Sequence, residues 1–420
     1  MRFLNIILFL PLALFGSNLK ELINLSQKNE QYFIKQIQSE QAKLTSSEVF
    51  RNYLPSLSLN SAYVANNKDR FIIDPQESLF AKFSLNFLLF DGGAREANLK
   101  ALKEQEKISL LSKEQTRNYL ALNATTLYFN SLSLRKIIAT NEQKVEFLKS
   151  TLQRLKKFYA TGLSSKDELE SIEAKFHLSV LDLHQNELKF ENIQKEIRIL
   201  TGENIIPEGQ ATLEKPFYDK VLNNYDVLIA RENVNLAREN VNLAKAQYYP
   251  KFFIQDNFGF YKNNYNPKVP YPFINLTNEI LEKYSQNNQI ILGIEWKIFD
   301  FNSRAKKVEK ERLNVQIANA NARLNERKNR EELLYLLKNI KVLKEQIIAL
   351  KLALKAANIA FESINKKYSA GLVSYVEYLQ ALEAKFKAQS DLELARNEFE
   401  ITKANYYFNA GVQIISKVKQ

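Results

Sequence analysis

Few side chains in this chain have the types and spacing that could do chemistry. His177 and His184 are the only two histidines, and their spacing of seven residues places both on one face of a helix, as in a possible metal site. No third ligand is evident near them, and the chain has no Cys. No nucleophile stands beside a suitable base. We therefore expect no enzyme activity, no bound metal and no cofactor.

A glycine pair is the second candidate for chemistry. Gly92 and Gly93 follow Phe90-Asp91 between a predicted strand and a predicted helix, where a phosphate-binding loop could lie. The Lys and the spacing of such a loop are missing. We interpret Asp91, and Asp300 in the similar stretch Phe299–Arg304, as helix caps whose carboxylates accept from free backbone N–H groups.

One short sequence occurs twice, once in each half of the chain. The stretch Tyr159–Ser165 (YATGLSS) returns as Tyr368–Ser374 (YSAGLVS), each time in the middle of a long helical pattern. A single glycine between two amphipathic runs is typical of a tight turn that joins antiparallel helices, because Gly tolerates the positive φ that ends a helix. The two copies therefore predict two hairpin tips.

Spacing around these tips shows that the chain is a tandem duplication. The separation between Asp91 and Gly162 along the sequence equals the separation between Asp300 and Gly371. Gly202 and Gly411 likewise follow their tip glycines at equal separations. We expect one architecture built twice, with repeats at 17–210 and 211–420, and connecting segments at about 202–223 and 411–420 that lie beside each other.

Composition restricts the class of protein. Ten Gly and nine Pro in 420 residues are few, which favours long elements with few turns. Residues 1–16 carry an early Arg and an apolar run of thirteen residues, too short to span a bilayer and typical of a secretory signal peptide. The net charge of +12 comes from Lys and Arg interleaved with acidic residues, so we expect no nucleic-acid partner.

Two segments, at about 55–90 and 250–300, change to a period of two. Large apolar residues alternate with polar ones in four runs, which mark four predicted strands of about ten to twelve residues each: Leu57–Tyr63, Leu79–Leu89, Phe252–Phe260 and Ile290–Ile298. This length and pattern, with many aromatic residues, is typical of transmembrane β-strands, although a soluble half-buried hairpin would alternate in the same way. Four strands cannot close a barrel, so several chains must contribute to one barrel.

The rising arms run from the strands to the tips without helix-breaking residues. Their roughly seventy residues would span about 100 Å as α-helix. Apolar positions step by threes and fours, as in Leu336, Ile340, Leu343 and Ile347. Such a narrow stripe favours a coiled coil of paired helices, whereas a compact helical bundle would need a broader apolar face.

This arrangement resembles the TolC family of bacterial outer-membrane efflux and export channels, across essentially the whole mature chain. The resemblance rests on the duplicated order of helix, strand, loop, strand, long helix, Gly-Leu turn and helix, and on Phe90–Gly93 and the Tyr-x-x-Gly-Leu tips. It implies a mainly α fold with transmembrane β-strands. Three copies would form a twelve-stranded barrel in the outer-membrane lipid, a helical periplasmic tunnel and an equatorial collar.

The resemblance also implies roles for residues near the tips. Gly162, Leu163 and Ser164, with Gly371, Leu372 and Val373, correspond to the adaptor-docking tips. Glu377 and Gln380 correspond to acidic rings that constrict the tunnel, although Gln380 departs from the acidic pattern. Tyr368, Asp167 and Glu168 lie where the family has polar links that hold the closed state. Solvated helix surface is the alternative interpretation of these acidic residues.

The implied function is that of a passive exit duct. The homotrimer would pass drugs and small toxic compounds from an inner-membrane pump of the RND, MFS or ABC type, through a periplasmic adaptor, and so contribute to multidrug resistance in a Gram-negative bacterium. The outer-membrane duct of type I protein secretion is an alternative. A periplasmic structural coiled-coil protein is a remote alternative, since it would explain the helices and not the aromatic strands.

Overall fold

The computed structural model describes residues 15–67, 74–217, 223–265 and 281–419. It divides into two compact units, which are described separately: unit one comprises residues 1–36, 111–228 and 324–420, and unit two comprises 37–110 and 229–323. Four helices contribute residues to both units: α2 (Glu30–Arg51), α3 (Ala94–Ala160), α5 (Tyr225–Ala246) and α7 (Ser303–Ser369).

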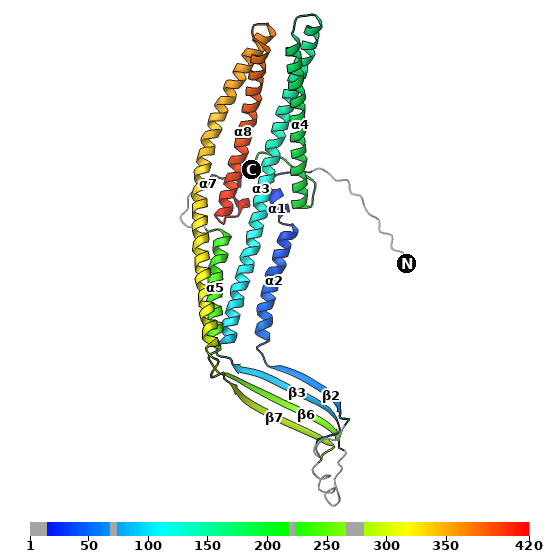
Figure 1. Ribbon diagram of the computed structural model, residues 1–420, viewed down its shortest axis with the longest axis vertical. Coiled ribbons are helices and arrows are strands. Elements are labelled where there is room, and N and C mark those ends of the chain that lie inside the picture. Colours follow the sequence, from blue (N-terminus) through cyan, green and yellow to red (C-terminus); the bar gives the residue numbers. More distant parts are fainter. Residues whose placement is uncertain (1–14, 68–73, 218–222, 266–280, 420) are drawn as a thin grey trace, which may run out of the picture. The chain divides into compact units, whose positions relative to one another are not determined.

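Unit two contains one antiparallel sheet of four strands, built from the two predicted hairpins. Its strands are β2 (Ser56–Ala65), β3 (Glu77–Phe90), β6 (Lys251–Asn264) and β7 (Tyr284–Glu295), in the order β2-β3-β6-β7 (Figure 1). The hairpins join where β3 pairs with β6, although these strands come from different halves of the chain. The first hairpin and the second thus share one sheet.

The register of this sheet separates an apolar face from a polar one. Phe83 pairs with Leu59 on β2 and with Phe258 on β6, so these side chains share a face. On the other face, the Ser84 hydroxyl donates to the Asn257 side-chain oxygen at 2.7 Å. The predicted alternation is therefore confirmed in the described strands.

The last strand ends earlier than its alternation predicts. β7 stops at Glu295, which pairs with Lys251, the first residue of β6. Beyond this point β7 has no neighbouring strand, so Trp296 and Ile298 lie outside the sheet that we expected them to join. The Trp296 indole instead donates to the Tyr248 carbonyl at 3.0 Å.

The two aspartates at the strand-to-helix junctions accept from backbone N–H groups as predicted. The Asp91 carboxylate accepts from the N–H of Arg95 at 2.8 Å, and that of Asp300 from the N–H of Arg304 at 3.1 Å. Helices α3 and α7 begin only at Ala94 and Ser303, so neither aspartate is the cap residue itself. Each also forms an ion pair with the arginine four residues on, which anchors the start of the helix.

Unit one contains two long helical hairpins. The first joins α3 to α4 (Lys166–Thr201), and the second joins α7 to α8 (Tyr375–Asn409) (Figure 1). Helices α3 and α7 each have 67 residues, in agreement with the equal rising arms expected from the repeat. The largest buried apolar cluster combines residues of all four helices, among them Leu120, Ile197, Leu336 and Tyr406.

Short elements surround the middle of unit one. These are β1 (Phe15–Ser17), α1 (Leu19–Ser26), β4 (Ile205–Pro207), β5 (Thr212–Leu213), η1 (Ile414–Lys417) and β8 (Val418–Lys419). β1 pairs in parallel with β4, and β5 pairs antiparallel with β8, so the segments after Gly202 and after Gly411 lie together as expected. Residues 1–14 of the predicted signal peptide and 218–222 of the connector lie outside the described residues.

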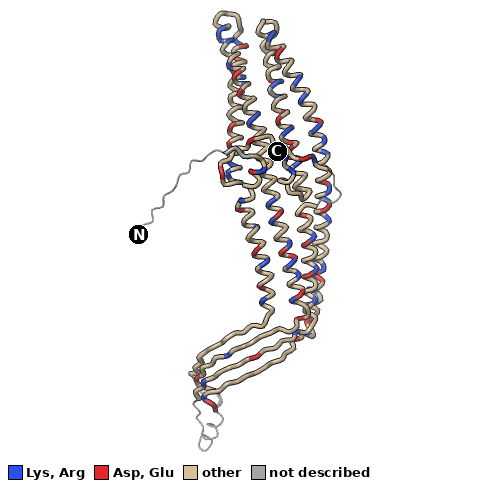
Figure 2. The backbone as a smooth tube through the Cα atoms, turned by 180° about the vertical axis from the view of Figure 1, so that it is seen from behind, with Lys and Arg blue, Asp and Glu red and all other residues tan. Residues whose placement is uncertain are grey.

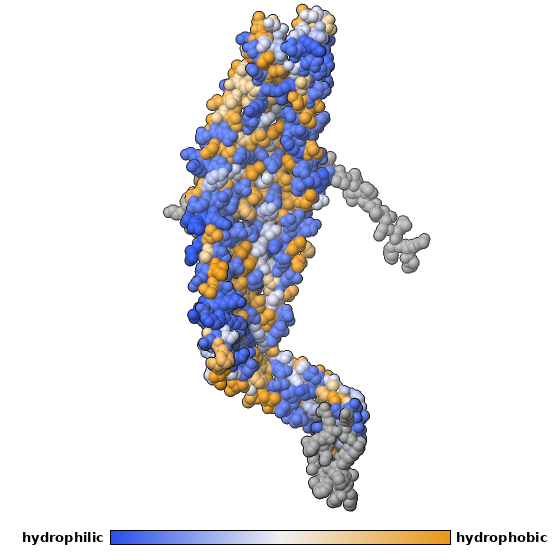
Figure 3. All heavy atoms as spheres, in the orientation of Figure 1, coloured by the Kyte–Doolittle hydropathy of each residue, from blue (hydrophilic) through white to orange (hydrophobic). Residues whose placement is uncertain are grey.

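The helical surface is polar and mixed in charge. Acidic and basic residues are interleaved along the helices (Figure 2), and apolar residues form small patches among hydrophilic ones on the face seen in Figure 3. Both patterns fit the solvated helix faces expected from the sequence. No helix in the described ranges is long and apolar enough to cross a membrane.

Candidate docking tips and gate

The tip of the first hairpin is a tight turn closed by two backbone hydrogen bonds. The Leu163 N–H donates to the Phe158 carbonyl at 2.9 Å, and the Gly162 N–H donates to the Tyr159 carbonyl at 3.0 Å. Gly162 has a φ of +77°, so the pair of bonds forms a Schellman motif around a left-handed glycine. Ser165 then caps α4 by accepting from the N–H of Glu168 at 3.3 Å.

The second tip repeats this turn. The N–H groups of Leu372 and Gly371 donate to the carbonyls of Lys367 and Tyr368, and Gly371 has a φ of +73°. Ser374 caps α8 in a capping box, in which the Glu377 carboxylate accepts from the Ser374 N–H at 2.9 Å. Because these bonds favour the ionised carboxylate, they hold the pKa of Glu377 below its usual value.

Each tip carries an exposed leucine. Leu163 is 76% exposed and Leu372 is 74% exposed. A Cβ added to Gly162 or Gly371 would meet no atom within 4 Å. Ser164 and Val373, the other predicted docking residues, are half-buried. Both tips thus present a leucine beside bare backbone, a surface on which another helical protein could pack.

A polar link joins the two hairpins just behind the tips. The Tyr368 hydroxyl on α7 donates to a Glu168 carboxylate oxygen on α4 at 2.7 Å. The Tyr368 ring stacks on that of Tyr378 at 4.6 Å, and the Arg154 guanidinium lies 5.4 Å from its centre. Burial, and then the Glu168 carboxylate, raise the pKa of Tyr368 well above its usual value. The hydroxyl therefore keeps its proton and remains a donor.

Further contacts between the hairpins were not predicted from the sequence. The Thr151 and Tyr378 hydroxyls lie 3.0 Å apart in a buried position, and Lys175 forms an ion pair with Glu383. Nearby, the Lys385 ammonium lies over the rings of Phe147, Phe361 and Phe386. The apolar stripe marked some of these rings as buried. Which helix faces meet could not be read from the spacing, because the repeat makes both hairpins alike.

The remaining predicted gate residues lie at the starts of α4 and α8. The Ser165 hydroxyl and the first N–H groups of α4 hold the pKa of Asp167 below its usual value, and the Tyr375 hydroxyl on α8 adds to this effect. Glu377 and Gln380 are exposed and lie three residues apart on α8. A single chain brings neither of them to the Tyr368–Glu168 link, so their role in a constriction stays a prediction.

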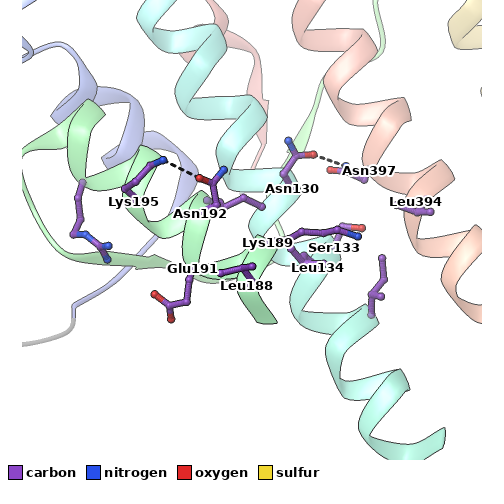
Figure 4. A pocket seen from close by; sticks show the side chains of 13 residues that line it. Asn130, Ser133, Leu134, Leu188, Lys189, Glu191, Asn192, Lys195, Leu394 and Asn397 are labelled. Carbon is purple, nitrogen blue, oxygen red and sulfur yellow. Dashed lines mark hydrogen bonds between the residues drawn. The ribbon is translucent and has the colours of Figure 1, made fainter. Parts of the chain in front are cut away.

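A groove of about 890 Å³ lies farther from the tips, lined by residues of α3, α4 and α8 (Figure 4). Its walls carry Leu188 and Leu394, and the Asn397 amide donates to the Asn130 side-chain oxygen at 2.7 Å. The lining is mainly apolar. This groove holds no arrangement of groups that could do chemistry.

His177 and His184 both lie on α4. The Nδ1 atom of His184 lies 2.9 Å from a Glu187 carboxylate oxygen, while the ring of His177 packs against that of Phe176. In the described part of the chain, no three His, Cys, Asp or Glu side chains come together as they would around a metal ion.

Comparison with known protein families gives one match to a family model. Residues 218–411, nearly all of the second repeat, match the outer membrane efflux protein family. A comparison with curated proteins finds no sequence match.

Solved structures match the fold over almost the full length. The chain is similar to CusC, described in terms of transmembrane channel formation, with a TM-score of 0.80, 16% identity and coverage of 97% of this chain and 96% of that chain. It is also similar to the CmeC outer membrane channel of Campylobacter jejuni, with a TM-score of 0.81, 17% identity and coverage of 95% and 88%. The third is the outer membrane protein VceC of Vibrio cholerae, with a TM-score of 0.82, 16% identity and coverage of 94% of this chain and 96% of that chain.

The duplicated hairpins and the four-stranded sheet agree with these comparisons on the fold of the chain. The family model that matches the second repeat describes outer membrane efflux proteins, and the solved structures with this fold are outer-membrane channels. The second repeat therefore matches the outer membrane efflux protein family, and the chain as a whole has the fold of the TolC-like channels.

Proposed function

We propose that three copies of this chain form the passive exit duct of a tripartite efflux system. An inner-membrane pump would supply the energy, and a periplasmic adaptor would join the pump to the duct. The cargo would be drugs and other small toxic compounds. The twelve strands of three sheets would close one barrel and so leave no strand edge open in lipid.

The single observation that carries this proposal is the pair of matching tips. Each turn is closed by two backbone hydrogen bonds and carries a leucine that is about three-quarters exposed. Removing an exposed apolar side chain from water is favourable, so a partner that covers these leucines would gain binding free energy. Six such tips around a trimer would offer a helical adaptor a repeated apolar docking surface.

The Tyr368–Glu168 link supports a gated duct. It ties the start of α4 to the end of α7, so the second hairpin cannot swing away without breaking it. Glu377 of three copies would add a ring of negative charge at the constriction, with Gln380 as a neutral ring beyond it. Such a ring favours cations and binds divalent ions.

A deletion strain tests the efflux role. We expect loss of the gene to raise susceptibility to dyes and small antibiotics, and the wild-type gene to restore resistance. A variant with Leu163→Asp and Leu372→Asp should reach the outer membrane in normal amounts and fail to restore resistance. Unchanged susceptibility, together with loss of a secreted protein, would instead favour the type I secretion duct.

A further inference from the structure

We infer that Tyr159 and Glu377 form a second link of the same kind, between neighbouring copies of the chain. The Tyr159 hydroxyl of one copy would donate to the Glu377 carboxylate of the next. This inference rests on the proposed ring of three copies. It concerns the Tyr159 hydroxyl and one carboxylate oxygen of Glu377, which make no hydrogen bond between the hairpins of a single chain, within its described residues.

The internal repeat places a donor and an acceptor at equivalent positions in both hairpins. Tyr159 and Tyr368 each lie three residues before their tip glycine, and Glu168 and Glu377 each lie six residues after it. Within one chain, only Tyr368 and Glu168 meet. The duplication therefore supplies one tyrosine and one glutamate more than the contact between the hairpins uses.

The two glutamates make similar local contacts. In Glu168, Oε2 accepts from the Ser164 hydroxyl at 2.9 Å and Oε1 accepts from Tyr368. In Glu377, Oε2 accepts from the N–H and the hydroxyl of Ser374. Its Oε1 atom has no hydrogen-bond partner among the residues that the structure describes. Glu377 thus has a free acceptor at the atom that Glu168 uses for the link.

Tyr159 provides the matching donor. Its side chain is 44% exposed, and its hydroxyl has no hydrogen-bond partner within the described ranges. Tyr368, its equivalent, is more enclosed because it packs on Tyr378 and below Arg154. A neighbouring hairpin would enclose Tyr159 in a corresponding way.

The faces of the hairpins determine which copy can supply the partner. The first hairpin contacts the second through the side that carries Glu168, its glutamate face. The second contacts the first through the side that carries Tyr368, its tyrosine face. Because the hairpins share one turn geometry, the tyrosine face of the first and the glutamate face of the second remain open in a single chain. A second copy placed head to tail repeats the internal contact with these two faces, and repeated head-to-tail contacts close into a ring.

The consequence is a closed end held by two kinds of link. Opening would need to break Tyr368–Glu168 inside each copy and Tyr159–Glu377 between copies. With a typical value for a hydrogen bond to a charged group, Tyr159→Phe should raise the ratio of open to closed channels about tenfold or more for each link lost. The variant lacking both tyrosine hydroxyls should open more often than either single variant.

Cross-linking tests the inference directly, since the chain has no cysteine of its own. Tyr159→Cys and Glu377→Cys would be carried by two differently tagged full-length copies that are co-expressed and treated with a short bis-maleimide. Any product that carries both tags must then join two chains. Tyr368→Cys with Glu168→Cys in one copy is the matched control, which should cross-link within the chain.

We expect dimers that carry both tags from the Tyr159 and Glu377 variants, and only monomers from the control. Light scattering of the untreated protein in detergent separates the two levels of the proposal. If the protein is trimeric, the control reacts and the mixed pair gives no dimer, the inferred link is overturned while the ring stands. If the protein is monomeric before treatment, the proposed ring itself fails.

Discussion

Tyr368 reaches from the second hairpin to the first and donates to Glu168 from a half-buried position. The hydroxyl and the carboxylate together make a charge-assisted bond, which is shorter and stronger than a bond between neutral groups. Its neighbours Tyr378 and Arg154 hold the ring in place from two sides. At the scale of single residues, this bond is the main candidate for the lock of the closed state.

Replacing Tyr368 by Phe removes only the hydroxyl and so tests whether its bond to Glu168 holds the closed state. We expect Tyr368→Phe to raise the resting conductance of the channel in planar bilayers, because the ring still packs and only the hydrogen bond to Glu168 is lost. The bond is worth about 1.5 to 3 kcal/mol when its acceptor is charged. Tyr335→Phe, at a side chain that is 62% exposed on the same helix, is the matched control and should behave as wild type. Equal conductance of the two variants would assign the lock to other contacts.

The raised pKa of Tyr368 predicts how the lock depends on pH. A group whose folded pKa is raised contributes stability that is complete below the ordinary value of 10.0 and is lost as the pH rises through the folded value. We therefore expect the resting conductance to stay low up to about pH 10 and to rise only above it. Tyr368→Phe should abolish this alkaline rise, whereas a rise that begins near neutral pH in both proteins would point to another group.

The sequence predicted only some of the residues that join the two hairpins. Tyr368, Asp167 and Glu168 could be selected because the resemblance places polar links there, and Glu168 does meet Tyr368. Tyr378, Thr151 and Lys175 could not be selected, since the partner of each lies on the other hairpin, in the opposite half of the chain. Glu377 has a role in a capping box, which its position three residues after Ser374 could have indicated.

At the scale of elements, Lys403 connects α8 to the short strands of unit one. Its ammonium donates to the Leu213 carbonyl at 2.7 Å and forms an ion pair with Glu400, and the Lys403 side chain is only 5% exposed. Glu400 in turn accepts from the Leu213 N–H at 2.8 Å. Burial lowers the pKa of Lys403, and the Glu400 carboxylate opposes this effect.

Replacing this lysine should weaken unit one strongly. We expect Lys403→Met to lower the free energy of unfolding by about 3 to 5 kcal/mol, because it leaves the half-buried Glu400 carboxylate without its ammonium partner. Lys417→Met, which removes a pair with Glu214 whose side chains are 34% and 40% exposed, should cost about 1 kcal/mol or less. Thermal unfolding of both variants, followed by circular dichroism in detergent, compares them. Similar losses would mean that burial of Lys403 does not matter.

The apolar face of the sheet makes a second prediction about elements. We expect Phe83→Arg, in the middle of β3, to cost about 2 to 4 kcal/mol and to lower the amount of protein in outer membranes. Ile294→Arg lies one residue from the end of β7 and should cost less. Asn86→Arg, on the opposite face of β3, is the matched control and should be tolerated. Normal membrane levels of both apolar-face variants would remove the membrane assignment of that face.

The elements themselves were largely predictable, because periods of two and of three to four persist over long runs. The long paired arms, and the position of the segments after Gly202 and Gly411 beside each other, follow from equal spacing in the two repeats, whereas the strands β5 and β8 in these segments were not predicted. The end of β7 did not follow, since the alternation continues through Trp296 and Ile298 although the neighbouring strand begins only at Lys251. The limits of a strand depend on its partner, which a local pattern does not contain.

At the scale of the whole molecule, Gly162 and Gly371 have two roles: they allow the tight turn at each tip, and they leave bare backbone for the proposed docking. We expect a variant with Gly162→Trp and Gly371→Trp to form trimers and to lose transport. The new side chains meet open space, so the main cost to folding is the left-handed backbone, about 1 to 2 kcal/mol per site.

Gly202 offers a matched control for this variant. It ends α4 away from the tips with a φ of +73°, and an added Cβ would likewise meet no atom within 4 Å. Gly202→Trp therefore carries the same backbone strain without changing a tip, and it should transport normally. Normal drug resistance with both tip glycines replaced would show that the tips contact no partner that transport needs.

Single-channel recording of the purified protein in planar bilayers tests whether this chain forms a gated channel. We expect discrete conductance steps that are small in the wild type and larger in a variant with Tyr159→Phe and Tyr368→Phe, in which both links are removed. If trimeric, folded protein gives no discrete steps in either form, the chain does not form such a channel.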